Sequence, residues 1–295
     1  MTITIGSRKS RLAVIQAEML MEKMSESHPG LELRLLTMTT TGDQILNQTL
    51  DTIGGKGLFL KELEKALLDG QADVLVHSLK DMPMELDDRI PIVALSSRED
   101  PRDVLVLPEG VTRLDLEKPV GCSSRRRALQ LQELLPGSRV QSVRGNVLSR
   151  LEKLDRGEYG ALVLAYAGLI RLGLGHRASR VFEPEEMVPA AGQGILALQA
   201  HKDIDRSLFR GFHDPRAWDI AMAERSFVRT LEGGCSLPIA AHARLEGDRL
   251  SITGFYQARD GAPVYRRFAE GHRRDAVALG RKLALETLKE SESDG

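Results

Sequence analysis

The segment from Gly121 to Arg127 carries side chains suited to binding an anion. It places Ser123 and Ser124 before three arginines, at the end of a strand-like run and the start of a helical one. Helix N-termini expose unpaired N–H groups and a partial positive charge, so they attract anions. Serine hydroxyls and guanidinium groups there would bind carboxylate or phosphate at about 1.5–3 kcal/mol per charge-assisted hydrogen bond. A solvated helix face is the alternative explanation.

The same pattern returns at the next strand-to-helix junction, which contains Arg144, Gly145 and Arg150. In a parallel sheet such junctions share the carboxyl edge, where ligands bind. The repetition therefore favours an anion site over a solvated helix face.

A carboxylate follows another strand. Val74 to Val76 is an apolar, buried-type run, and it ends in His77-Ser78-Leu79-Lys80-Asp81. An aspartate held in a cleft can stabilise a transient cation and shuttle a proton. A surface ion pair or an Asx turn would explain the same residues. From this segment alone both interpretations remain open.

Cys235 has a neighbourhood typical of an exposed, tight loop, since two glycines precede it and Ser236-Leu237-Pro238 follows. No Cys–His–Asn protease signature surrounds it, which favours a covalent tether over a hydrolytic nucleophile. An inert, small hydrophobic side chain is the alternative.

The segment Gly54 to Gly57 lacks the spacing of a phosphate-binding loop and has no Ser or Thr after its lysine, which excludes a nucleotide site there.

Short apolar runs alternate with amphipathic stretches, a pattern typical of strand–helix units around a mostly parallel sheet. Ser10 is predicted to cap the helix that follows the first strand. Breaks in the pattern predict a hinge at 98–103 and a Pro- and Gly-rich crossing at 184–194. The polar, glycine-bearing stretch from Thr41 to Gly57 predicts a lid. A further unit is expected to begin near Pro215.

The composition excludes several classes of protein. The 295 residues, 42% hydrophobic and 28% charged, leave room for two or three globular domains. A net charge of -1 and 4% aromatic residues argue against a nucleic-acid partner. Two cysteines are too few for a disulfide scaffold or a four-thiolate zinc site, so no metal is expected. With no apolar signal core or membrane-spanning stretch, we expect a cytoplasmic protein without a membrane partner.

Taken together, these segments resemble the porphobilinogen deaminase family, also called the hydroxymethylbilane synthases. The matching motifs, in family order, are GSRKSRLA, GGKGLFLKELE, HSLKDMP, REDPRD, GCSSRRR, RGNVLSRL, LAYAGLIRLGL, PAAGQG and EGGC. They run from Gly6 to Cys235 and so cover most of the chain. Each motif is short, and their shared order makes the resemblance specific.

The resemblance implies an α/β fold with three domains and a monomeric state. Domain 1, residues 1–97 plus 193–212, would be discontinuous and contain the catalytic cleft. Domain 2, residues 101–188, would be an arginine-rich lobe that binds carboxylates. These two would resemble the lobes of type II periplasmic-binding proteins. Domain 3, residues 215–295, would be a small α+β domain carrying Cys235.

The resemblance also implies a dipyrromethane cofactor, joined by a thioether to Cys235. The implied reaction condenses four molecules of porphobilinogen head to tail, with loss of ammonia at each addition. It finally releases hydroxymethylbilane for haem- or chlorophyll-type tetrapyrrole biosynthesis. Asp81 matches the family's catalytic aspartate, which would stabilise the cation left when the amine departs and manage protons on the pyrrole nitrogens.

Each pyrrole carries acetate and propionate groups, so the growing chain needs many positive side chains. Besides Cys235, the residues that match the family's cofactor-binding positions are Lys80, Ser124, Arg126, Arg127, Arg144 and Gly145. The residues that match its substrate-binding positions are Arg8, Ser10, Arg150 and Arg171. Asp43 and Lys56 lie on the predicted lid.

Four positions depart from the usual family pattern and affect how the substrate would be placed. They are Cys122 in place of Thr, Arg125 in place of an apolar residue, Gln199 in place of Glu, and Arg11 in place of Pro. The first of these removes a hydroxyl from the predicted anion site.

Two other functions fit parts of the sequence. A non-catalytic, two-lobed module that binds a small anion would use the arginines, but it gives Asp81 and Cys235 no task. A thiol enzyme such as an acyl transferase would need a base near Cys235, and His242 is the nearest candidate in sequence. We expect His242 on a strand of the last domain, which argues against that role.

Overall fold

The structure is a computed structural model of the chain that describes residues 1–40, 60–231 and 237–293. Asp43, Lys56 and Cys235 lie outside these residues. The chain forms two compact units, unit 1 with residues 1–99 and 195–218, and unit 2 with residues 100–194 and 219–295. Predicted domain 2 lies in unit 2, and so do residues 219–295 of predicted domain 3. The boundaries of the three domains therefore remain a prediction.

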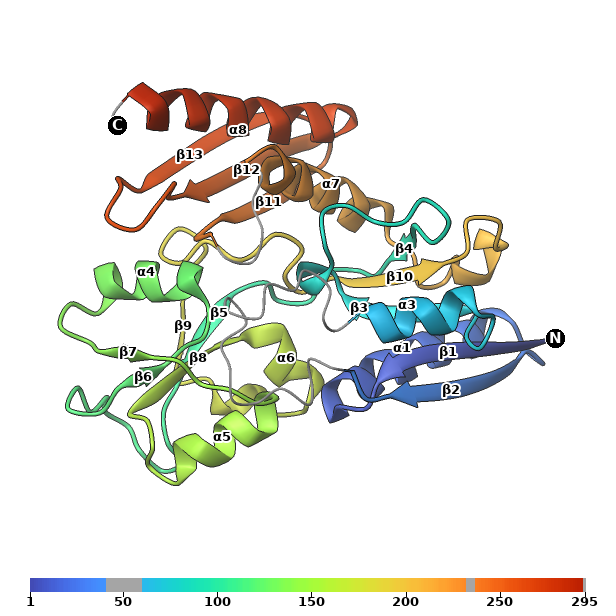
Figure 1. Cartoon of the computed structure of the whole chain (residues 1–295), viewed down its shortest axis with the longest axis horizontal. Helices are drawn as coiled ribbons and strands as arrows, with labels where there is room; N and C mark the ends of the chain where they lie inside the picture. Colours follow the sequence, from blue (N-terminus) through green and yellow to red (C-terminus); the bar gives the residue numbers. More distant parts are fainter. Residues whose placement is uncertain (41–59, 232–236, 294–295) are drawn as a thin grey trace. The chain divides into compact units, whose positions relative to one another are not determined.

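Unit 1 is built on a five-stranded sheet with the order β2-β1-β3-β10-β4 (Figure 1). Its strands are β1 (Thr2–Arg8), β2 (Glu32–Met38), β3 (Val74–Ser78), β4 (Ile92–Leu95) and β10 (Leu196–Ala200). β1 is parallel to β2 and β3, whereas β10 is antiparallel to both β3 and β4. The helical elements are α1 (Arg11–Ser27), α3 (Lys61–Leu68), η1 (Leu79–Asp81) and η3 (Arg206–Phe209).

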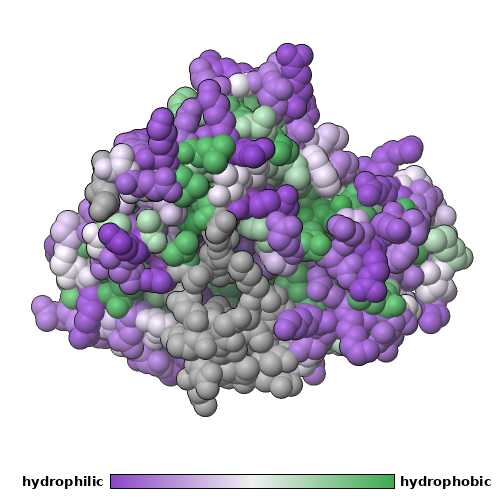
Figure 2. Space-filling model, turned by 45° about the horizontal axis from the view of Figure 1, so that its top comes forward, coloured by the Kyte–Doolittle hydropathy of each residue, from purple (hydrophilic) through white to green (hydrophobic). Residues whose placement is uncertain are grey.

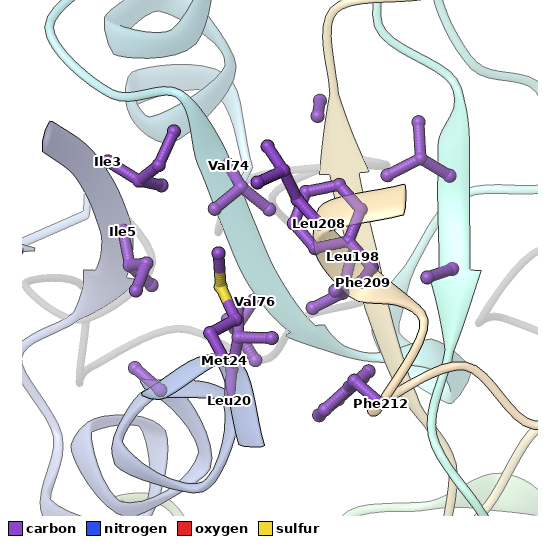
Figure 3. Close-up of a cluster of buried hydrophobic side chains, with 14 of the residues drawn as sticks. Ile3, Ile5, Leu20, Met24, Val74, Val76, Leu198, Leu208, Phe209 and Phe212 are labelled. Atoms are coloured by element: carbon purple, nitrogen blue, oxygen red, sulfur yellow. The ribbon is translucent and has the colours of Figure 1, made fainter. Parts of the chain in front are cut away.

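The main core of unit 1 lies between the sheet and α1. Leu20 and Met24 are four residues apart, so they share one face of the helix and pack against alternate residues of the strands. The buried members labelled in Figure 3 are Ile3, Ile5, Leu20, Met24, Val74, Val76, Leu198, Leu208, Phe209 and Phe212. Leu75, which alternates with Val74 and Val76, belongs instead to a second cluster with Leu63 of α3.

Unit 2 contains a second five-stranded sheet, with the order β7-β6-β8-β5-β9. Its strands are β5 (Asp103–Val106), β6 (Val120–Gly121), β7 (Val140–Gln141), β8 (Ala161–Ala165) and β9 (Arg180–Val181). β6 is parallel to β7 and β8, and β5 is antiparallel to β8 and β9. The helical elements are α4 (Arg125–Leu134), α5 (Val147–Asp155), α6 (Tyr166–Arg171) and η2 (Gly175–Arg177).

The two sheets share one topology. In each, three parallel strands are followed by an antiparallel one, β10 in unit 1 and β5 in unit 2, and each of these begins just after a crossing between the units. This pair of lobes confirms the predicted α/β class. Two strands of these sheets, β4 and β9, were not predicted; they are four and two residues long.

The C-terminal part of the chain is a small α+β structure, as predicted. Its antiparallel sheet has the order β11-β12-β13. The elements are α7 (Pro215–Thr230), β11 (Ala240–Glu246), β12 (Arg249–Tyr256), β13 (Tyr265–His272), η4 (Arg273–Asp275) and α8 (Ala276–Ser293). His242 is buried on β11, which confirms its expected place on a strand.

The surface is mainly polar on the face seen in Figure 2, where hydrophobic residues form small, separate patches among hydrophilic ones. Within the described ranges, no helix is long and apolar enough to cross a membrane.

Candidate active site

In unit 1, predicted site residues lie at the carboxyl ends of β1 and β3. The two strands are parallel neighbours, with Gly6 opposite Leu75, so Arg8 at the end of β1 reaches the edge where β3 ends. Gly6 is required for this approach, because a Cβ atom on it would lie 2.5 Å from Cδ2 of Leu75. Ser10 caps α1 as predicted, and its side chain accepts a hydrogen bond from the backbone N–H of Ala13 at 3.4 Å.

Lys80 and Asp81 follow β3 in the short helix η1. The turn is anchored by Leu79, which is fully buried and donates its backbone N–H to the carbonyl oxygen of Ile195 at 3.0 Å. With Leu79 pointing inward, Lys80 is half-buried and Asp81 is exposed. The fold therefore presents a carboxylate at the same sheet edge as Arg8 and Ser10.

The residues beneath this edge form a polar support. Nε2 of Gln16 on α1 donates to Oγ of Ser78 at 3.2 Å, which ties the helix to the end of β3. His77 is buried, and burial together with the positive charge of Arg8 lowers its pKa from 6.5 to about 4. The imidazole is thus neutral near pH 7 and lies buried beneath the sheet edge that carries Arg8, Lys80 and Asp81.

In unit 2, the arginine-rich segment follows β6 and opens α4, as predicted. Ser124 caps the helix, and its Oγ accepts a hydrogen bond from the backbone N–H of Arg127 at 3.5 Å. Gly121 lets β6 approach β8, since a Cβ atom there would lie 2.4 Å from Cδ2 of Leu162. Oγ of Ser123 accepts a hydrogen bond from the backbone N–H of Val143 at 3.0 Å. These contacts join the ends of the three parallel strands.

Arg126 and Arg127 are buried around one carboxylate, that of Asp103. Nη1 of Arg126 lies 2.6 Å from Oδ2 of Asp103 and also donates to the carbonyl oxygen of Val188 at 2.7 Å. Nε and Nη2 of Arg127 lie 2.9 and 2.8 Å from Oδ1. Burial alone would raise the pKa of Asp103, but the two guanidinium groups outweigh it and hold that pKa well below its usual range. Asp103 was not among the predicted site residues.

Arg144, Gly145 and Arg150 lie at the junction of β7 and α5. Asn146 caps α5 by accepting a hydrogen bond from the backbone N–H of Ser149 at 3.0 Å. Gly145 has a φ of 113°, a conformation that favours glycine, and its carbonyl oxygen accepts a hydrogen bond from Nε of Arg150 at 2.8 Å. Arg144 and Arg150 are both half-buried. Because β6 and β7 are parallel neighbours, this junction lies at the same edge as Ser124.

Arg171 is the last residue of α6, which follows β8 directly. Its Nη2 donates to the carbonyl oxygen of Gly194 at 2.6 Å, so the side chain reaches the second crossing between the units. The structure thus brings Ser124, Arg144, Gly145 and Arg150 to the ends of the parallel neighbours β6 and β7, and Arg171 lies one short helix beyond the end of β8.

Three of the four departures from the family pattern have clear structural settings. Cys122 is buried in an apolar cluster, and burial raises the pKa of its thiol. It therefore fills core space rather than the anion-binding edge. Arg125 forms an ion pair with Asp260. Gln199 is fully buried, and its Nε2 donates to Oε1 of Glu64 at 2.8 Å and to a backbone carbonyl oxygen at 2.9 Å.

The chemistry of the two units differs. Unit 1 offers an exposed carboxylate beside cationic side chains, and unit 2 offers guanidinium groups and a helix N-terminus. The guanidinium groups and the helix N-terminus of unit 2 suit a ligand with several carboxylates, and they fit a dipyrromethane bearing acidic side chains. Among the residues that the structure describes, no group of three His, Cys, Asp or Glu side chains is arranged to hold a metal ion.

One solved structure that this chain matches is the second substrate-binding domain of a putative amino acid ABC transporter from Streptococcus pneumoniae. It is 14% identical to this chain, with a TM-score of 0.43, and the match covers 72% of this chain and 90% of that one.

Two family models match the chain. Residues 3–208 match the porphobilinogen deaminase, dipyromethane cofactor binding domain, and residues 218–289 match the porphobilinogen deaminase, C-terminal domain. A porphobilinogen deaminase from Acetivibrio thermocellus is 55% identical, over 98% of this chain and 99% of its own length. A porphobilinogen deaminase from Alkaliphilus oremlandii is 54% identical, over 100% of this chain and 99% of its own length. The chain belongs to the porphobilinogen deaminase family.

Proposed function

We propose that this chain is a hydroxymethylbilane synthase, a transferase that joins four porphobilinogen molecules head to tail with release of ammonia. Its product would be hydroxymethylbilane, for tetrapyrrole biosynthesis. The observation that carries the proposal is the exposed carboxylate of Asp81 in a chain that belongs to this family. The buried side chain of Leu79 anchors the turn that holds Asp81 at the end of β3.

We assign to Asp81 the stabilisation of the cation that forms on porphobilinogen as ammonia leaves. A fixed carboxylate lowers the energy of that cation without having to reorganise during the step. The same group can accept and return the pyrrole N–H proton, because Asp81 is accessible at the sheet edge. Arg8, Ser10, Arg150 and Arg171 would bind the acetate and propionate groups of the substrate.

The cofactor in this proposal is a dipyrromethane joined by a thioether to Cys235. It supplies the pyrrole terminus from which the chain grows. The residues that would hold its carboxylates and ring nitrogens are Lys80, Ser124, Arg126, Arg127, Arg144 and Gly145. Support comes from the capped N-terminus of α4 and the four arginines and lysines among these residues, which match the charge of such a group.

Further assignments belong to the same proposal. We assign the chain to the cytoplasm as a monomer, with domain 1 as 1–97 plus 193–212, domain 2 as 101–188 and domain 3 as 215–295. Asp43 and Lys56 would lie on a lid over the site. No nucleic acid, membrane or metal enters the proposed reaction.

The experiment that tests the function compares Asp81→Asn with the parent chain. Ammonia release and hydroxymethylbilane formation are measured from porphobilinogen, and the cofactor content is checked by mass. We expect Asp81→Asn to keep its cofactor and thermal midpoint while turnover falls by about 10²–10³-fold. Asp88→Asn, which changes an exposed acid of the same unit, should retain the parent rate. Normal turnover by Asp81→Asn, or a parent that binds porphobilinogen without releasing ammonia, contradicts the proposal.

A further inference from the structure

Gln193 joins the two crossings between the units. It is fully buried in the second crossing, and its Nε2 donates to the carbonyl oxygen of Pro101 in the first crossing at 2.6 Å. The same Nε2 lies 2.9 Å from Oδ1 of Asp103. Oε1 of Gln193 accepts a hydrogen bond from Nη2 of Arg127 at 3.4 Å. One side-chain amide therefore contacts both crossings and the buried arginine cluster.

Asp103 is the centre of this cluster. Its Oδ1 accepts hydrogen bonds from Arg127 and Gln193, and its Oδ2 accepts one from Arg126. A guanidinium group is a rigid planar fork, so a buried carboxylate on one edge fixes the direction of its other N–H groups. Both arginines are thereby oriented by Asp103, which is itself fully buried as the first residue of β5.

The residues on either side of Gln193 are also held. The backbone N–H of Gly192 donates to Oε2 of the buried Glu224 at 2.7 Å, and the carbonyl oxygen of Gly194 accepts from Arg171 at 2.6 Å. The second crossing is thus fixed at three consecutive residues. Two of these contacts lead to arginines that the proposed function places on ligand carboxylates.

We propose that Asp103 and Gln193 are positioning residues, which orient Arg126 and Arg127 for the carboxylates of the cofactor and join this pair to both crossings. The inference rests on the proposed function, which supplies the ligand. Neither residue needs to touch the cofactor, since each acts through a guanidinium group. Pre-orientation lowers the cost of ordering long side chains when the ligand binds.

The test uses the full chain with two variants and a matched control. Asp103→Asn removes the charge at nearly constant size, and Gln193→Met removes the amide while keeping the length of the side chain. The control is Asp100→Asn, whose ion pair with Arg102 lies in the same segment and involves neither Arg126 nor Arg127. Gln193→Met decides the question by itself if the folding of Asp103→Asn fails.

Each protein is prepared without cofactor and is then incubated with hydroxymethylbilane. The first quantity measured is the rate of cofactor uptake, followed by intact mass. The second is the rise in thermal midpoint between the apo and the loaded form. The parent and Asp100→Asn should agree in both. For Asp103→Asn and Gln193→Met, we expect cofactor uptake to slow by about tenfold, which is the low end of the effect of removing the hydrogen-bond partners of metal ligands. We also expect a smaller rise in thermal midpoint on loading.

A purely structural role would lower the midpoints of the apo and loaded forms equally and leave the uptake rate unchanged. That result in Gln193→Met, or in a folded Asp103→Asn, overturns the inference. If the mass of the parent chain does not increase with hydroxymethylbilane or porphobilinogen, the proposed function itself is contradicted. Because this result is obtained with the parent chain alone, it is distinguished from a failure of the inference.

Discussion

Replacing His77 by Gln should change how the stability of unit 1 depends on pH. The imidazole is buried on β3, and its pKa is lowered from 6.5 to about 4, chiefly by burial, with the charge of Arg8 acting in the same direction. Between these pH values the unfolded chain binds a proton that the folded chain does not. The free energy of unfolding therefore falls as the pH falls from 6.5 towards 4, and it is fully retained above 6.5.

The size of the effect follows from the shift. A difference of about 2.5 units at 1.36 kcal/mol per unit gives about 3 kcal/mol across the whole window. At pH 5.0 most of the unfolded chain has bound the proton and little of the folded chain has, so about 2 kcal/mol is already lost relative to pH 7.5. The variant His77→Gln lacks this contribution.

Urea unfolding at pH 7.5 and 5.0, followed by tryptophan fluorescence, measures the difference. The chain has one tryptophan, Trp218, which belongs to unit 1 and so reports on the unit that contains His77. On going to pH 5.0 the parent should lose about 2 kcal/mol more than His77→Gln. The control His176→Gln, which removes an exposed ring, should follow the parent. Equal losses in the parent and His77→Gln would refute a neutral, buried His77.

Three further substitutions test single contacts. Arg144→Leu should slow elongation in a single-turnover assay by about tenfold or more, because a pyrrole carboxylate loses its charged partner, and a normal rate would contradict that role. Gly121→Ala should lower the free energy of unfolding by about 1–3 kcal/mol, since its Cβ atom would meet Leu162. Glu224→Ala leaves the buried N–H groups of Gly192 and Ala243 without this acceptor, which should cost about 2–4 kcal/mol in urea unfolding. Unchanged urea midpoints would contradict the last two.

The local elements were predictable from the sequence because their signals are local. The cap at Ser10, the helix that starts at Arg125 and the strand that starts at Val74 each follow from residue type and periodicity within one segment. Parallel strands then place their ends at one edge, so Arg8 at the end of β1 lies at the edge where β3 ends. β4 and β9 were not predicted because neither leads directly into an α-helix, as the short strands β6 and β7 do.

Tertiary contacts account for what the sequence could not predict. The motif GCSSRRR shows three equivalent arginines, yet Arg125 is paired at the surface while Arg126 and Arg127 are buried on Asp103. Asp103 and Gln193 are 90 residues apart in the chain, and no local pattern relates them. An aspartate that follows Pro-Arg in a charged segment is typical of a surface turn, so the local sequence does not predict that Asp103 is buried. The predicted lid residues Asp43 and Lys56 lie outside the described residues.

The most direct test of the account is the intact mass of the denatured protein after incubation with porphobilinogen. The chain has two cysteines, so the parent, Cys235→Ala and Cys122→Ala together assign any thioether. The account predicts that the parent and Cys122→Ala carry the added mass of two linked pyrrole units, and that Cys235→Ala does not. An unmodified parent, or an added mass that persists in Cys235→Ala, would contradict it.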